Sequence, residues 1–226
     1  MRAPRGLPSA LVIGTVIAAS LASAPTIVQP EVNNASCTAP EFPEPYQGVS
    51  PCSSEAVTCA ALNALFTWNP AADTSPDAGY LRAYPLIAPS GLQNPDGTPQ
   101  QPFNPSADSA GFDTTTAWRD ATDTSTALVA YTTRRSQGRT RANALFDIVQ
   151  YRYPTTAVDA AGIPKPGAVP IGPAWQWWAT AHLTTADDGS LRVSYLTQYS
   201  PPVEAADGKA ITNPADRWSC QRPSVA

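Results

Sequence analysis

An alternating pattern in the C-terminal half of the chain constrains its fold most strongly. In residues 175–184 (WQWWATAHLT) every second side chain is apolar or small, and a similar alternation returns in residues 191–199. Such alternation is typical of β-strands that bury one face. The four residues 187–190 (DDGS) suit a tight turn. The two segments therefore predict an antiparallel hairpin with one buried face.

Two segments farther upstream predict more strands of the same sheet. Residues 127–134 (ALVAYTTR) and 142–153 (ANALFDIVQYRY) are rich in β-branched and aromatic residues, and Gly138 lies in the connection between them. These residue types favour strands. Residues 154–173, rich in proline and glycine, form a long loop before the C-terminal hairpin.

Helical signals come earlier in the chain. Ser53 can cap a helix that runs from Ser54 to about Trp68. Residues 75–77 (SPD) begin a second helix, which Pro85 bends or breaks, and a short third helix is expected around residues 115–121. This order predicts an α+β fold, in which N-terminal helices pack on a curved four-stranded antiparallel sheet.

The N-terminus has the layout of an export signal. Arg2 and Arg5 precede an uncharged apolar segment, Leu7 to Ala24, and Pro25 follows it directly. As one hydrophobic helix, this segment would rise about 27 Å, near the lower limit for crossing a bilayer. We expect residues 1–24 to be a retained anchor of a single-pass membrane protein, or a cleaved signal of a secreted one. Either way the remainder lies outside the cytoplasm.

Proline content suggests the domain organisation behind that segment. The chain contains 25 prolines, and residues 25–51 are rich in them without any helical or strand period. We expect residues 25–51 to be an extended linker, residues 52–203 a single folded domain, and residues 204–226 a C-terminal tail.

All four cysteines, Cys37, Cys52, Cys59 and Cys220, lie downstream of the apolar segment. An even number in an exported chain indicates two disulfides, with three possible connectivities. A zinc site is not expected, because no C-x-x-C pair occurs and the lone His182 is distant in sequence. No metal and no cofactor are predicted.

Charge and motifs exclude several classes of function. The formal net charge is −4 and no basic stripe occurs, so direct nucleic-acid binding is not expected. The chain lacks the sequence patterns of phosphate-binding loops, nucleophile elbows and zinc hydrolases. His182 falls on the polar face of its strand, and we assign no catalytic residue.

A few side chains remain as candidates for a binding site. Trp175, Trp177 and Phe146 could line a ligand cavity, although such residues usually form core. Asp147 lies inside a strand among apolar neighbours, where a carboxylate could act as a base. Trp178 breaks the alternation by standing on the polar face, where it either contacts a protein partner or is covered by the 154–173 loop.

Residues 60–86 (AALNALFTWNPAADTSPDAGYLRAYPL), with the strands that follow, carry a family resemblance. Their W-N-P, S-P and R-A pattern and the order of elements over residues 54–200 resemble the NTF2-like extracytoplasmic domains of bacterial, especially actinobacterial, conjugation and type IV secretion proteins. The resemblance implies a cone-shaped fold and a non-enzymatic, membrane-tethered subunit that self-associates and contacts other envelope proteins. The same fold hosts isomerases, ligand binders and assembly subunits alike. The alternative function is therefore an extracytoplasmic small-ligand-binding module, and an isomerase-like enzyme ranks below it.

Overall fold

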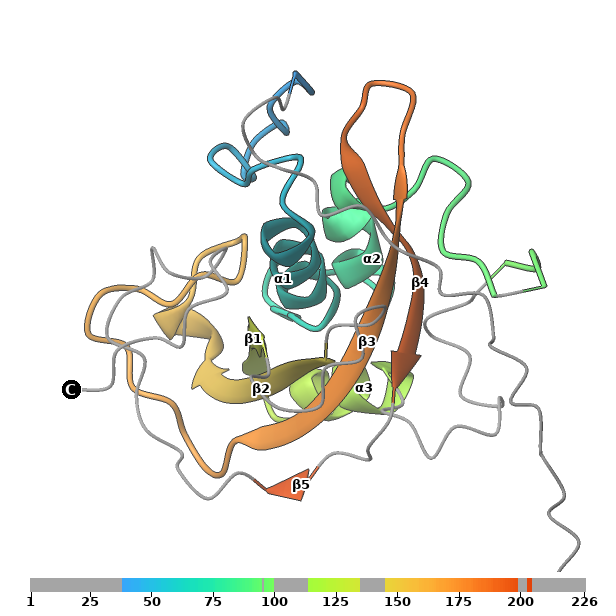
Figure 1. Ribbon diagram of the computed structural model, residues 1–226. Coiled ribbons are helices and arrows are strands. Elements are labelled where there is room, and N and C mark those ends of the chain that lie inside the picture. The colour runs from blue at the N-terminus through green and yellow to red at the C-terminus, as the bar shows by residue number, and fades with distance from the viewer. Residues whose placement is uncertain (1–37, 95, 100–113, 135–144, 199–202, 205–226) are drawn as a thin grey trace, which may run out of the picture.

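The computed structural model describes residues 38–94, 96–99, 114–134, 145–198 and 203–204 (Figure 1). Its helices are α1 (Ser54–Leu65), α2 (Ala78–Ala83), the 3-10 turn η2 (Tyr84–Leu86), α3 (Thr114–Asp123) and the 3-10 turn η3 (Thr155–Ala157). Its strands are β1 (Thr126–Arg134), β2 (Leu145–Pro154), β3 (Trp175–Thr185), β4 (Leu191–Gln198) and β5 (Val203–Glu204).

The sheet has the strand order β1-β2-β3-β4, and every pairing is antiparallel. The predicted α+β class and four-stranded antiparallel sheet are therefore confirmed. The sheet consists of two antiparallel hairpins, β1–β2 and β3–β4. They are joined because the first half of β3 pairs with β2, whereas its second half pairs with β4. The two-residue β5 pairs with the start of β3 and was not predicted.

Helix α1 lies in the corner between these two hairpins (Figure 1) and contacts β1, β2 and β4. The side chain of Ser53 accepts a hydrogen bond from the amide of Ala56, which confirms the predicted cap. The helix ends at Leu65, before Trp68, because Trp68 and Leu128 exchange two backbone hydrogen bonds of 2.8 Å. This bridge diverts the chain from helical geometry to the edge of the sheet.

Both outer strands of the sheet have a neighbouring segment along the edge. Trp68 occupies the edge of β1 through its bridge to Leu128. On β4, Ile87 forms a parallel bridge with Val193, and the amide of Ala88 donates to the Val193 carbonyl at 2.9 Å. These segments occupy backbone groups that would otherwise be open to strand addition.

Three side chains of residues 42–49, a segment placed in the predicted linker, belong to the hydrophobic core. Phe42, Tyr46 and Val49 are buried and pack with residues of α1. The Tyr46 hydroxyl donates to the carbonyl of Arg82 at 2.8 Å, and the guanidinium of Arg192 lies 4.4 Å from the centre of the Phe42 ring. The folded domain therefore begins before Cys52, since apolar contacts with α1 fix a segment whose own sequence has no regular period.

The predicted N-terminal hydrophobic helix lies outside the described residues, as do residues 25–37 of the linker and residues 205–226 of the tail. Within the part of the chain that the structure describes, no helix combines the length and the hydropathy needed to cross a bilayer.

Candidate functional site

The inner face of the sheet, which faces α1, is packed with side chains. Phe146 and Trp177 are almost fully buried there, together with Cys59 and Leu62 of α1. The ring of Phe66, just after α1, meets Trp177 edge-on at a centroid distance of 5.4 Å. Two of the three predicted cavity residues are therefore core residues in direct contact with α1 and its C-terminal end.

The third predicted cavity residue, Trp175, lies elsewhere. It begins β3 opposite Gln150 and is 38% exposed, although it shares the face of Trp177. Gln150 is buried, and its side-chain amide donates to the carbonyl of Phe66 at 2.8 Å. The structure thus separates Trp175, at the rim of the sheet, from Trp177 and Phe146 in the core.

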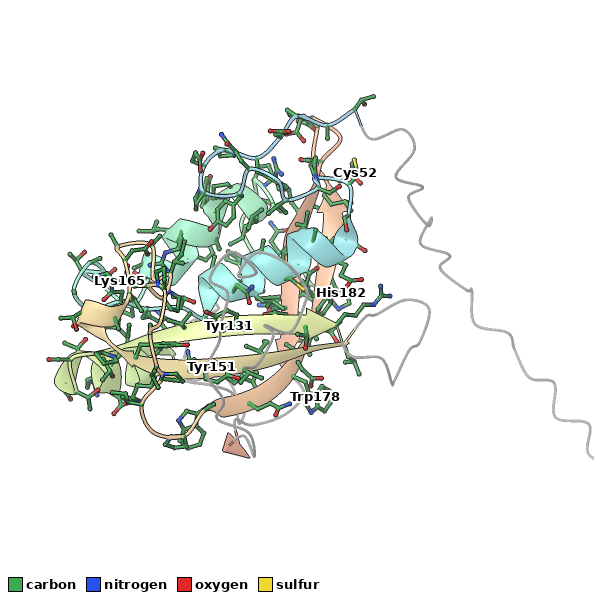
Figure 2. All side chains as sticks on the ribbon, turned by 90° about the vertical axis from the view of Figure 1, so that its left-hand side faces the viewer. Cys52, Tyr131, Tyr151, Lys165, Trp178 and His182 are labelled. Atoms are coloured by element: carbon green, nitrogen blue, oxygen red, sulfur yellow. The ribbon has the colours of Figure 1, made fainter. Side chains whose placement is uncertain are left out.

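Asp147 and Trp178 lie on the opposite face of the sheet from Phe146 and Trp177. They are direct cross-strand partners, and Thr133 of β1 completes their row. Figure 2 shows Trp178 below the strands and α1 above them. Trp178 is half-buried there. The hypothetical base Asp147 therefore does not share a face with the predicted cavity residues.

The outer face also carries several aromatic side chains and His182. Tyr131 and Tyr151, on neighbouring strands (Figure 2), meet edge-on at 5.9 Å, and Val158 of the connection after β2 packs beside Tyr131. On the second hairpin, the His182 and Tyr195 rings lie 5.0 Å apart. Partial burial lowers the pKa of His182 below its usual 6.5, which favours the neutral ring.

The motif that carries the family resemblance forms a corner between α1 and α2. The indole nitrogen of Trp68 donates to the Pro76 carbonyl at 3.0 Å. The Asp73 carboxylate accepts a 2.6 Å bond from the Asn69 amide and another of 2.6 Å from Arg82. The side chains of the motif form hydrogen bonds with backbone groups or with one another. The motif therefore has a structural role that the sequence alone did not reveal.

Cys52 and Cys59 are both disulfide-bonded. Cys59 lies inside α1 with no solvent exposure, and Cys52 is buried just before the helix. Cys37 and Cys220 lie outside the described residues, so the connectivity stays open. Among the residues that the structure places, no group of three or more His, Cys, Asp or Glu side chains could hold a metal ion.

Two groups of large apolar side chains are exposed to solvent. Leu81 and Tyr84, one helical turn apart in α2 and η2, are 66% and 55% exposed, and we call them the α2 surface. Val169 and Ile171, in the connection to β3, are 65% and 41% exposed, and Trp175, the first residue of β3, is 38% exposed. We call these three residues the loop surface. Only Trp175 was a sequence candidate, because apolar residues beside prolines gave no sign of whether they would be covered.

Comparisons with protein families, curated proteins and solved structures found no match to this chain.

Proposed function

We propose that the protein is a membrane-tethered extracytoplasmic scaffold or assembly subunit and not an enzyme. Residues 1–24 would anchor it, and the domain, with an NTF2-like cone shape, would contact other envelope proteins. Assembly of a conjugation or secretion apparatus is the process that the family resemblance implies.

The contact between Phe66 and Trp177 carries this proposal. In a cone-shaped domain, the space between the helices and the sheet is where a small ligand or substrate would bind. Here the Phe66 ring packs edge-on against Trp177, and Cys59 and Leu62 pack beside it. A domain whose inner face is occupied by its own side chains is better suited to binding through its outer surface.

Two further features support the proposal. Disulfide-bonded cysteines are typical of proteins outside the reducing cytoplasm, and both described cysteines are oxidised. Contiguous exposed apolar patches mark protein-binding surfaces, and the large exposed apolar side chains of the α2 surface and the loop surface are where this domain offers such contacts. Both features favour an exported protein that works through contacts.

Affinity purification of the tagged full-length protein from native membranes tests the proposal. Membranes are treated with a reversible cross-linker, solubilised in detergent, and analysed by mass spectrometry beside membranes with an unrelated tagged anchor protein. We expect the protein in the membrane fraction with specific envelope proteins. Recovery as a lone monomer, or from the cytosol with reduced cysteines, would contradict the proposal.

A further inference from the structure

One of the two described cysteines precedes α1 and the other lies inside it, and both are disulfide-bonded. The Val57 amide donates to the Ser53 carbonyl at 3.0 Å, so the helical hydrogen bonds begin at Ser53. From Ser53 to Cys59 the helix axis rises about 9 Å. Cα atoms joined by a disulfide are usually about 4.4–6.8 Å apart. Cys59 is therefore too far along α1 to bond with a residue at the start of the helix.

Cys52 lies still farther from Cys59 than Ser53 does. The backbone of Ser53 is extended, with φ −93° and ψ 109°, so the chain does not fold back along α1. Figure 2 shows Cys52 outside the helix. The carbonyl of the preceding Pro51 accepts a 2.8 Å hydrogen bond from the start of β4. A bond between Cys52 and Cys59 would require α1 to unwind.

The segment that follows Cys37 leads back to Cys52. The ring of Phe42 lies 4.4 Å from the guanidinium of Arg192 in β4. Pro51, next to Cys52, also contacts the start of β4. Cys37 precedes Phe42 by only five residues, which span at most about 17 Å. Chain length therefore keeps Cys37 near the strand end beside which Cys52 lies.

Cys59 opens on the other side of α1 from this segment. The buried side chains of residues 42–49 form one cluster with Val57 and Ala61. At 3.6 residues per turn, Cys59 stands about 160° around the helix from each of these two residues. The helix itself therefore separates Cys59 from residues 42–49, and Cys52 is the nearer partner for Cys37.

The C-terminal end of the described chain lies near the surroundings of Cys59. Glu204 of β5 pairs with Trp175 of β3. Trp177, two residues along the same strand, belongs to the buried cluster that contains Cys59. Cys220 follows Glu204 by sixteen residues, which can span about 50 Å. The tail therefore starts beside the part of the sheet that faces Cys59, with ample length to reach it.

We propose that the two disulfides of this protein are Cys37–Cys52 and Cys59–Cys220. Each bond joins two Sγ atoms, and each pair of thiols gives up two protons and two electrons. A disulfide oxidant of the cell envelope accepts them, and its own disulfide is reduced to two thiols. The assignment goes beyond the scaffold function and does not depend on it, since it requires only export from the reducing cytoplasm.

This pattern fastens both ends of the chain to the entry of α1. The Cys37–Cys52 bond leaves residues 25–36 as the free tether, which spans at most about 40 Å when fully extended. The Cys59–Cys220 bond closes a loop that contains every described strand and ties the tail to α1. A tethered domain of this kind stays close to its membrane.

Peptide mapping without reduction tests the assignment. The full-length protein is alkylated to block free thiols, purified from native membranes, and digested with trypsin and a glutamate-specific protease. Each cysteine then lies on its own peptide, because cleavage follows Glu31, Glu41, Glu55, Arg82 and Arg217. By mass spectrometry we expect peptide 32–41 linked to 42–55, and peptide 56–82 linked to 218–226, with no alkylated cysteine.

Two double variants provide a matched comparison. Cys37→Ser/Cys52→Ser removes both members of one proposed bond, so the other bond should form and no free thiol should remain. Cys37→Ser/Cys220→Ser removes one member of each bond. It should leave two free thiols on Cys52 and Cys59, because α1 keeps them apart. Thiols are counted from the mass added by alkylation in denaturant.

Several results would overturn the assignment. Peptide 56–82 linked to 42–55 or to 32–41 would show a different connectivity. An alkylated cysteine in the wild-type protein, or a disulfide-linked dimer on a non-reducing gel, would also contradict it. Loss of both free thiols in Cys37→Ser/Cys220→Ser would show that Cys52 and Cys59 can meet. If the expected links form but no envelope protein co-purifies, the assignment stands and only the scaffold function fails.

Discussion

The guanidinium of Arg82 and the carboxylate of Asp73 form an ion pair of 2.6 Å in a largely buried corner of the domain. Arg82 also donates to the carbonyl of Thr67 at 2.8 Å, just beyond the end of α1. Asp73 in turn accepts from the amide of Asn69. This pair therefore fixes α2 against the C-terminal end of α1.

Removing one partner of this pair should destabilise the domain strongly. Asp73→Ala leaves the buried guanidinium without its counter-charge and the Asn69 amide without its acceptor. We expect a loss of about 3–5 kcal/mol in the free energy of unfolding, measured by urea titration with the disulfides intact.

The exposed ion pair between Arg134 and Glu55 provides the control, since both side chains are more than one third exposed. Glu55→Ala should cost less than about 1 kcal/mol. Equal costs for the two substitutions would show that Arg82 and Asp73 do not support the corner.

Gly79 packs against the end of α1, and replacing it tests how closely α2 approaches. A Cβ atom at this position would lie 2.4 Å from the backbone carbonyl oxygen of Leu65. Helix propensity alone would make Gly79→Ala stabilising by about 1 kcal/mol. Overpacking against a backbone atom costs about 1–3 kcal/mol, so we expect a net loss of stability in the urea titration. A gain would mean that the two helices can separate freely.

Local signals in the sequence correctly predicted much of this fold. Ser53 has the residue type and position of an N-cap, so the start of α1 was predictable. Alternation alone placed Trp177 and Trp178 on opposite faces of β3, because side chains alternate along any strand. The turn at residues 187–190 set the β3–β4 hairpin in the same way.

What the sequence did not reveal depends on tertiary contacts. Phe42 and Tyr46 stand among prolines without any period, so their burial could not be read locally. Trp175 and Trp177 lie on the same face of β3, but Trp175 is exposed and Trp177 is buried, because Trp175 lies at the end of the strand. The role of Phe66 in filling the inner face depends on where α1 ends. The anchor at residues 1–24 stays a prediction.

The two tryptophans of β3 that share a face should respond differently to truncation. Trp177→Ala removes a buried ring from the contact with Phe66 and should cost about 3–5 kcal/mol. Trp175→Ala removes a partly exposed ring and should cost about 1 kcal/mol. The free energies of unfolding of the two variants are compared by urea titration with the disulfides intact. A mild effect of Trp177→Ala would mean that the inner face is open and would favour the ligand-binding alternative.

Stability should depend on pH through His182, the only histidine of the chain. Partial burial lowers its pKa below 6.5 in the folded domain, so the unfolded chain binds the proton more readily. The contribution of neutral His182 is fully present above about pH 6.5 and is lost as the pH falls toward the folded pKa. We expect the urea midpoint to fall between about pH 7.5 and pH 5.5, and His182→Gln to reduce that fall. An unchanged pH profile in the variant would contradict this assignment.

Photo-cross-linking in living cells tests most directly whether the domain works through its exposed apolar surfaces. A photoreactive amino acid replaces Tyr84 or Ile171 in the full-length protein, and Asp123 serves as an exposed control position. Illumination should give discrete protein adducts at 84 and 171 in the membrane fraction and none at 123. Equal labelling at all three positions, or no adduct at 84 and 171, would contradict the account.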